Sequence, residues 1–173
     1  MLTFSEAVRD RAAAVTLVSF DVDGVLTDGQ LLYTSSGDEI KAFHVQDGAA
    51  IKLLRDSGIE VALITGRRSV MVERRADELG IRHVYQGVPD KILALQALAG
   101  QLHLPLSNFA HVGDDLPDLP LFERVGLAIG VPNGHPATHS RVHYITTLAG
   151  GHGVAREVCE LLLRARGRWP FDP

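Results

Sequence analysis

Residues 17–29 read LVSFDVDGVLTDG, an apolar run that ends in two aspartates one residue apart, Asp21 and Asp23. The run predicts a buried strand over 17–20, which Gly24 would help to end. In a parallel sheet, ligands bind at the carboxyl ends of the strands, so both carboxylates would face that edge. Two acidic groups this close repel each other unless a cation or a proton lies between them. The segment therefore favours a metal site.

Other interpretations of this segment stay open on these residues alone. The Asp-Gly pairs at 23–24 and 28–29 are typical of tight turns that carry no chemistry. A short D-x-D pattern is also the metal-binding motif of nucleotide-sugar transferases. A calcium loop of the D-x-D-x-D-G kind is excluded, because Val25 stands where its third ligand would be and Leu26 where its glycine would be.

Length and composition indicate an ordinary globular protein. The 173 residues leave room for one domain, over 1–173, with a sizeable core. A net charge of −4 argues against a nucleic-acid or anionic-membrane partner. No apolar stretch reaches transmembrane length, and the amino terminus lacks the basic-then-apolar order of a signal peptide. We therefore expect a cytoplasmic location. Cys159 is the one cysteine, so no internal disulfide is possible.

Apolar periodicity alternates along the chain between strand and helix, with short connections. Strands are expected at 17–20, 60–64, 83–85, 110–113, 127–129 and 143–146, and helices at 3–14, 47–54, 70–79, 91–102, 119–124 and 154–166. This order predicts an α/β fold, a Rossmann-like parallel sheet with helices on both faces.

Several local features complete the predicted fold. The N-terminal helix, within 1–15, is expected to begin with a capping box of Thr3 and Glu6, and Asp47 is expected to cap the second helix. Short strands at 31–34 and 40–43 predict a β-hairpin inserted after the first strand. Residues 165–173 are expected to form a flexible tail that could fold over an adjoining subunit's site.

Three further motifs lie where this architecture would place ligands. Thr65-Gly66-Arg67 follows a strand, and its hydroxyl, backbone amides and guanidinium can hold an oxyanion; Thr65 is equally suited to capping a helix. Lys91 opens a helix and carries little information by itself. Residues 113–118, GDDLPD, again end a strand with clustered carboxylates, for which a purely structural reason is hard to find.

Taken in order, the four motifs resemble the haloacid dehalogenase superfamily of phosphohydrolases, over residues 21–118. The resemblance implies that Asp21 is the nucleophile and Asp23 the general acid/base. It implies that Thr65 binds the phosphoryl group and that Lys91 steadies both the nucleophile and the phosphate.

The same resemblance implies a metal site with magnesium as the cofactor. It makes Asp114 a ligand beside Asp21 and the backbone carbonyl of Asp23, with Asp115 or Asp118 in support. Every candidate ligand is an oxygen, which favours magnesium over zinc.

Four runs carry a closer resemblance, to the 3-deoxy-D-manno-octulosonate 8-phosphate phosphatase group. They are DVDGVLTDG (21–29), FHVQDG (43–48), YQGVPDK (85–91) and AGGHGVAREVC (149–159). The resemblance implies a haloacid dehalogenase-like fold without a cap domain, and a homotetramer in which a neighbour closes the site. The gap between Asp28 and Asp47 fits a projecting hairpin and leaves no room for a cap.

Four residues are expected to contact the substrate, and two of them, His44 and His152, lie in loops that match the group's motifs. The four are Gly66, Arg67, His44 and His152, and Arg67 is equally suited to a substrate carboxylate or to a neighbouring acid. The group usually has a basic residue where Gln46 stands and an arginine where His152 stands. Both replacements remove fixed positive charge near the expected place of an anionic sugar acid.

The predicted function is hydrolysis of 3-deoxy-D-manno-octulosonate 8-phosphate to the free sugar acid and phosphate, through an aspartyl-phosphate, on the way to bacterial lipopolysaccharide. Alternatives are a nonulosonate 9-phosphate substrate with the same mechanism, and a non-catalytic assembly or regulatory domain. Phosphoryl transfer to a sugar is disfavoured by the missing cap. His135, His139 and His143 recur at four-residue spacing, but Pro136 argues against one continuous zinc-binding helix.

Overall fold

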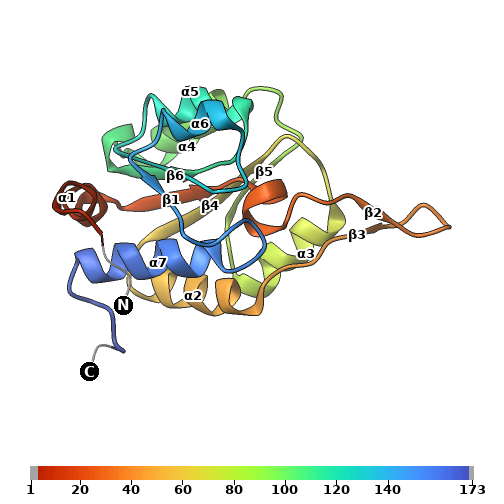
Figure 1. The fold of residues 1–173 in the computed structure, drawn as a ribbon, viewed down its shortest axis with the longest axis horizontal. Helices are drawn as coiled ribbons and strands as arrows, with labels where there is room; N and C mark the ends of the chain where they lie inside the picture. Colours follow the sequence, from red (N-terminus) through yellow and green to blue (C-terminus); the bar gives the residue numbers. More distant parts are fainter. Residues whose placement is uncertain (1–3, 172–173) are drawn as a thin grey trace.

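A six-stranded parallel sheet forms the centre of the protein in the computed structural model, which describes residues 4–171. The strand order is β5-β4-β1-β6-β7-β8. The six strands are β1 (Leu17–Phe20), β4 (Glu60–Thr65), β5 (His83–Gln86), β6 (Phe109–Val112), β7 (Leu127–Gly130) and β8 (Tyr144–Ile145). Between β1 and the next helix, β2 (Leu32–Tyr33) and β3 (Glu39–Ile40) pair as an antiparallel hairpin that projects from the body (Figure 1). The predicted α/β fold with its inserted hairpin is confirmed.

Helices cover both faces of the sheet. They are α1 (Glu6–Ala14), α2 (Val45–Asp56), α3 (Val70–Leu79), α4 (Lys91–Leu102), α5 (Leu119–Phe122), α6 (Pro136–His139) and α7 (Val154–Ala165). Figure 1 shows α2, α3 and α7 below the sheet and α4, α5 and α6 above it. Among the described helices, none has the length and apolar character that crossing a bilayer requires.

The two layers of helices enclose two apolar clusters, one on each face of the sheet. Phe20 of β1 packs with α1, α2, α3 and α7, together with Leu54 and Leu161. Leu17 of the same strand packs on the other face, with Leu95 and Phe122. Because side chains of a strand alternate between faces, a strand buried on both sides must be apolar at nearly every position. This explains the continuous apolar run that precedes the first aspartate pair.

The first helix begins later than the sequence predicted. Ser5 is the N-cap residue of α1, and its hydroxyl accepts a hydrogen bond from the backbone N–H of Val8 (3.3 Å). Glu6 is therefore the first helical residue. Thr3, the expected capping residue, lies outside the described residues.

The prediction that Asp47 caps its own helix is wrong. His44 is the N-cap residue of α2, and Asp47 lies in the first turn, buried. Asp47 Oδ1 instead accepts a hydrogen bond from the backbone N–H of Arg156 (2.8 Å), in the first turn of α7. Gly153, the N-cap residue of α7, has no side chain that could do this. Asp47 therefore joins α2 to α7, and burial raises its pKa.

The segment after α7 contacts the body of the domain. Trp169 is 9% exposed, and its ring lies against the guanidinium of Arg156 (4.8 Å from the ring centre). Arg166 donates to the backbone carbonyls of Ala13 and Val15, and Arg168 donates to that of Ser57. These contacts fix part of the predicted flexible tail to the domain; its mobility in solution stays a prediction.

Cys159 lies in the middle of α7 and is completely buried. Burial raises the pKa of its thiol, which disfavours the reactive thiolate. The side chain therefore acts as a small apolar residue of the core, as its surroundings in the sequence predict.

Candidate active site

The carboxyl ends of three neighbouring strands meet at one edge of the sheet. β1 lies between β4 and β6, so the residues that follow these strands lie close together. A cavity of about 410 Å³ opens there. It is lined by seven residues predicted for the site, Asp21, Asp23, Thr65, Gly66, Arg67, Lys91 and Asp114, by Asp115, and by three residues not predicted, Val88, Pro89 and Pro117.

Asp21 immediately follows β1 and is 7% exposed. One carboxylate oxygen accepts a hydrogen bond from the backbone N–H of Val22 (2.7 Å), and the other lies 2.8 Å from Lys91 Nζ. Burial raises the pKa of Asp21 against the opposing charge of Lys91, and the charge of Asp118 raises it further. The side chain is thus held in one orientation, with its negative charge dependent on neighbouring cations.

Thr65 is the last residue of β4, next to Asp21 across the sheet edge, and is 2% exposed. Its hydroxyl accepts a hydrogen bond from the backbone N–H of Arg67 (3.4 Å). The N-cap residue of the following helix, α3, is Ser69, so Thr65 does not cap that helix. Thr65 is instead one of the residues that line the cavity.

Lys91 opens α4 and contacts two acids at once. Its ammonium lies 2.8 Å from Asp21 Oδ2 and 2.7 Å from Asp118 Oδ1. Burial would raise the pKa of Asp118, but the hydrogen bond and charge of His111 and the charge of Lys91 outweigh it and hold that pKa well below its usual range. An ionised Asp118 with two cationic or donor partners is the stable form at this position.

Asp118, rather than Asp115, supports the loop that carries Asp114. Its Oδ2 accepts hydrogen bonds from the backbone N–H groups of Asp114 (3.0 Å) and Asp115 (3.2 Å). The side chain of Asp115 is used locally, where it accepts from the backbone N–H of Leu116 (2.8 Å). The structure therefore distinguishes between two residues that the sequence left as alternatives.

Asp114 has the surroundings of a cation ligand. Burial, together with the charges of Asp21 and Asp118, raises its pKa to about 8. Oxygen atoms of these three carboxylates lie within 4.8 Å of one another. A divalent cation would relieve this repulsion, and a set of oxygen donors suits magnesium. Each oxygen of Asp118 already has two hydrogen-bond partners, whereas each oxygen of Asp21 has one. Asp21 and Asp114 are therefore the side chains with acceptor capacity left for the cation.

Gly24 leaves the space that Asp114 occupies. A Cβ atom at this position would lie 2.0 Å from Asp114 Oδ2, and the backbone has φ = +92°. Only glycine combines that conformation with so close an approach. The glycine that ends the first strand in the sequence is therefore also a condition for the acidic cluster.

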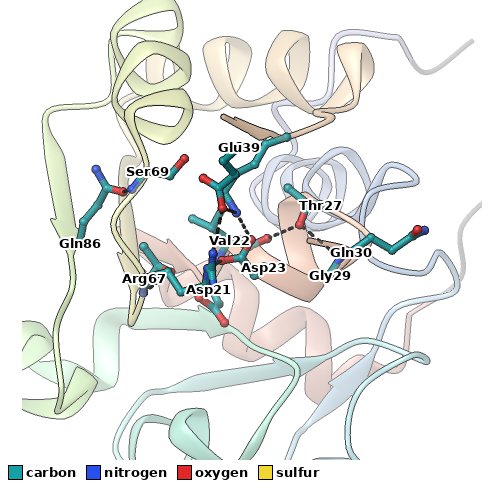
Figure 2. Close-up of polar contacts among 12 residues, drawn as sticks. Asp21, Val22, Asp23, Thr27, Gly29, Gln30, Glu39, Arg67, Ser69 and Gln86 are labelled. Carbon is teal, nitrogen blue, oxygen red and sulfur yellow. Dashed lines mark hydrogen bonds and ion pairs between the residues drawn. The ribbon is translucent and has the colours of Figure 1, made fainter. Parts of the chain in front are cut away.

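The carboxylate of Asp23 pairs with cations at the base of the hairpin and beside β4. Figure 2 shows it beside Glu39 and Arg67. Lys41, whose side chain is 2% exposed, forms an ion pair with Asp23 Oδ1 and lies 3.5 Å from Glu39 Oε1. Arg67 Nε lies 3.6 Å from Asp23 Oδ2, and Arg67 also donates to Glu39 (2.9 Å) and to the hydroxyl of Tyr33 (3.3 Å).

Sequence reasoning missed Lys41. It follows β3, in a segment where an exposed lysine is the ordinary expectation, and no local pattern marks it as buried. A signal was available in the acids around it, since Asp23 and Glu39 need a buried or shared cation if the hairpin folds back over the site. Arg67 pairs with acids here, which is one of its two predicted roles.

Two predicted substrate contacts lie outside the residues that line the cavity. His44 precedes α2 and lies near Gly153, on the side of α7. His152 Nδ1 lies 2.7 Å from the carbonyl oxygen of Gly150. The structure does not bring His44 or His152 to the cavity, and their contact with substrate stays a prediction.

The histidines at four-residue spacing have separate roles. His135 Nδ1 accepts from the backbone N–H of Ala137, and His143 Nδ1 accepts from that of Ala128. His139 Nε2 lies 3.0 Å from the carbonyl oxygen of Val131. α6 spans only Pro136–His139, so the three rings do not lie on one helix face.

The fold and this acidic edge correspond to a known class of enzymes. A family profile described as haloacid dehalogenase-like hydrolase matches residues 83–158. The 3-deoxy-D-manno-octulosonate 8-phosphate phosphatase KdsC of Escherichia coli (strain B / BL21-DE3) is 46% identical over 164 residues, which are 95% of this chain and 87% of that protein.

Solved structures agree with this comparison. The crystal structure of 3-deoxy-D-manno-octulosonate 8-phosphate phosphatase from Yersinia pestis has a TM-score of 0.94 and 44% identity, and covers 95% of this chain and 89% of that one. The enzyme from Moraxella catarrhalis, crystallised with magnesium ion, phosphate ion and KDO, has a TM-score of 0.93 and 49% identity, and covers 95% and 94%.

This chain belongs to the haloacid dehalogenase-like hydrolases and, within them, to the family of 3-deoxy-D-manno-octulosonate 8-phosphate phosphatases. The resemblance predicted from the sequence motifs is confirmed.

Proposed function

We propose that this protein is a magnesium-dependent phosphatase that hydrolyses 3-deoxy-D-manno-octulosonate 8-phosphate to the free sugar acid and phosphate. The observation that carries the proposal is the buried carboxylate of Asp21, held by Lys91 at 2.8 Å, on a cavity that Thr65 and Asp114 also line. The names of the relatives in the family supply the substrate.

Asp21 acts as the nucleophile. One of its oxygens forms a bond to phosphorus while the bond from phosphorus to the sugar oxygen breaks, which leaves an aspartyl-phosphate. Water then attacks that phosphorus, and phosphate and the Asp21 carboxylate are regenerated. A bound magnesium ion supplies positive charge that offsets the repulsion between the carboxylate and the anionic ester.

Lys91 and Thr65 position the reacting groups. Lys91 contacts Asp21 directly and keeps a positive charge beside the attacking oxygen throughout. Thr65, on the adjacent strand end, offers a hydroxyl, and Gly66 offers a backbone amide, to the phosphoryl oxygens. Asp114, with Asp21 and the carbonyl of Asp23, would hold the cation.

Asp23 serves as the general acid and base. It protonates the departing sugar oxygen in the first step and removes a proton from water in the second. Its ion pair with Lys41 and the nearby Arg67 draw the carboxylate toward the hairpin. We propose that Arg67 exchanges its contact with Glu39 for the carboxylate of the sugar acid when substrate binds.

We also propose a homotetramer in a cytoplasmic location. The hairpin exposes Leu31, Leu32, Tyr33 and Ile40, each at least 46% exposed. A two-stranded hairpin with an apolar surface is marginal by itself in water, which favours a second copy of the chain as its partner. A neighbour at this position could bring residues such as His152 to the site.

The experiment is phosphate release from a panel of sugar phosphates, with magnesium and with a chelator. The panel contains the eight-carbon and nine-carbon keto-acid phosphates and simple hexose phosphates. We expect turnover that needs magnesium and strongly prefers the eight-carbon acid. Preference for the nine-carbon acid would retain the mechanism and overturn the substrate. No phosphate release from any of them would support the non-catalytic alternative.

A further inference from the structure

A polar pair lies inside the apolar part of the sheet. Ser19 of β1 and His111 of β6 are partners in the strand register, and both are completely buried. Their neighbours along these strands, Phe20, Ala110 and Val112, are apolar. His111 also lies against the ring of Phe122, at 5.7 Å between ring centres. Burying two polar side chains in such surroundings is unfavourable unless they hydrogen bond.

The pair forms a continuous chain of hydrogen bonds that ends at the active site. Ser19 Oγ lies 3.2 Å from the carbonyl oxygen of Ala110 and 2.8 Å from His111 Nδ1. His111 Nε2 lies 3.0 Å from Asp118 Oδ1. An ionised carboxylate can only accept, so Nε2 carries the hydrogen and donates it to Asp118.

Asp118 connects this hydrogen-bond chain to two parts of the active site. Its Oδ1 is shared between His111 and Lys91, and Lys91 in turn contacts Asp21. Its Oδ2 accepts from the backbone N–H groups of Asp114 and Asp115. A change in the orientation of this one carboxylate would therefore move both the cation beside the nucleophile and the loop that carries the proposed metal ligand.

We propose that Ser19 and His111 are positioning residues, which hold Asp118 in the orientation that places Asp114 for magnesium and Lys91 for Asp21. The inference rests on the proposed function for its catalytic part, but its metal-binding part stands independently. If the pair served stability alone, two apolar side chains would fill the same space without the cost of desolvation. Groups that orient metal ligands from behind change metal affinity or activity by about 10- to 100-fold when removed.

The test compares three variants with the unmodified protein. His111→Leu removes the donor to Asp118, His111→Gln retains an amide N–H at a similar reach, and Ser19→Ala removes only the far end of the chain. Val18→Ala is the matched control, because Val18 is equally buried in the same strand but belongs to the opposite face. The readouts are the Kd for magnesium by calorimetry, the thermal midpoint, and kcat and KM for an aryl phosphate at saturating magnesium.

We expect His111→Leu to raise the Kd for magnesium about tenfold and to lower kcat about tenfold, with KM nearly unchanged. His111→Gln should restore most of both, and Ser19→Ala should lie between them. Val18→Ala should lower the thermal midpoint without changing the Kd. An unchanged Kd in both His111→Leu and Ser19→Ala would overturn the inference, as would failure of His111→Gln to improve on His111→Leu.

The two proposals fail in different ways. If the unmodified protein binds magnesium but releases no phosphate, the proposed function is wrong, and the Kd values still decide the positioning role. If His111→Leu does not fold, Ser19→Ala and His111→Gln decide it by the same measurement.

Discussion

The carboxyl edge of the sheet and the projecting hairpin each pair an aspartate with a lysine. The two lysines differ in the elements that hold them in place. Lys91, 6% exposed, begins a helix of 12 residues and contacts Asp21 beside the central strand. Lys41 follows a strand of two residues, in a hairpin that has few packing contacts of its own, and contacts Asp23. The charge beside the nucleophile is thus held by the core, whereas the ion pair of Asp23 depends on a lysine of the hairpin.

The largest effect should come from the nucleophile itself. Asp21→Asn removes the attacking oxygen while its amide oxygen can still accept from Val22, so we expect kcat to fall on the order of 10³-fold or more with the fold intact. Phosphate release and circular dichroism check this. Substantial residual turnover would contradict the assignment of Asp21.

Replacing each lysine in turn tests the difference between the core and the hairpin directly. Lys91→Met leaves Asp21 and Asp118 buried with one cation fewer, and we expect a loss of about 3–5 kcal/mol in the free energy of unfolding and almost no turnover. Lys41→Met should lower kcat only about tenfold, since Arg67 still lies near Asp23. Denaturant titration and steady-state kinetics measure both. Equal effects of the two variants would show that the hairpin is as firmly held as the core.

Gly24 and Gly37 have similar φ angles, so replacing each by alanine compares the packed site with the open hairpin turn. Gly24→Ala places a methyl group 2.0 Å from Asp114 Oδ2 at φ = +92°, and should cost about 3 kcal/mol and weaken magnesium binding. Gly37→Ala, at φ = +90° in the hairpin turn, meets nothing within 4 Å and should cost only about 1 kcal/mol. Urea unfolding and magnesium calorimetry measure both. Unchanged magnesium affinity in Gly24→Ala would contradict the close approach.

The smallest effect concerns protons at the acidic edge. The pKa of Asp114 is raised from 3.8 to about 8 in the metal-free protein, so folding takes up a proton between these values and the metal-free protein loses stability as pH rises through that range. Magnesium binding at pH 7 should then release about one proton, and almost none at pH 9.5. Calorimetry in buffers of different ionisation enthalpy measures this. Release that does not change between the two pH values would contradict the shifted pKa.

The sequence motifs predicted the residues at the carboxyl edge of the sheet because both the strands and these residues are defined by adjacent positions in the sequence. An apolar run followed by Asp21 defines both a buried strand and the residue at its carboxyl end, and the same holds for Thr65 and Asp114. Parallel strands then bring these ends together without further information. The clash that Gly24 avoids follows from the same arrangement.

The residues that sequence reasoning missed depend on contacts between distant segments. Asp47 suits the N-cap of its own helix, yet its partner is Arg156, because packing of α2 against α7 offers it an unsatisfied amide. His111 is a polar residue in an otherwise apolar strand. Its hydrogen-bonding role can be inferred only from the strand register, which pairs it with Ser19. Lys41 is buried by the return of the hairpin, which no periodic pattern records.

Because Cys159 is buried, the folded protein has no accessible thiol of its own. The only thiol of the chain is completely buried and its pKa is raised, so a maleimide label would find no target on the folded protein. A cysteine introduced at the exposed Ser36, in the turn of the hairpin, would then carry a fluorophore or spin label at one known place. The buried thiol thus allows any motion of the hairpin to be measured without another change to the sequence.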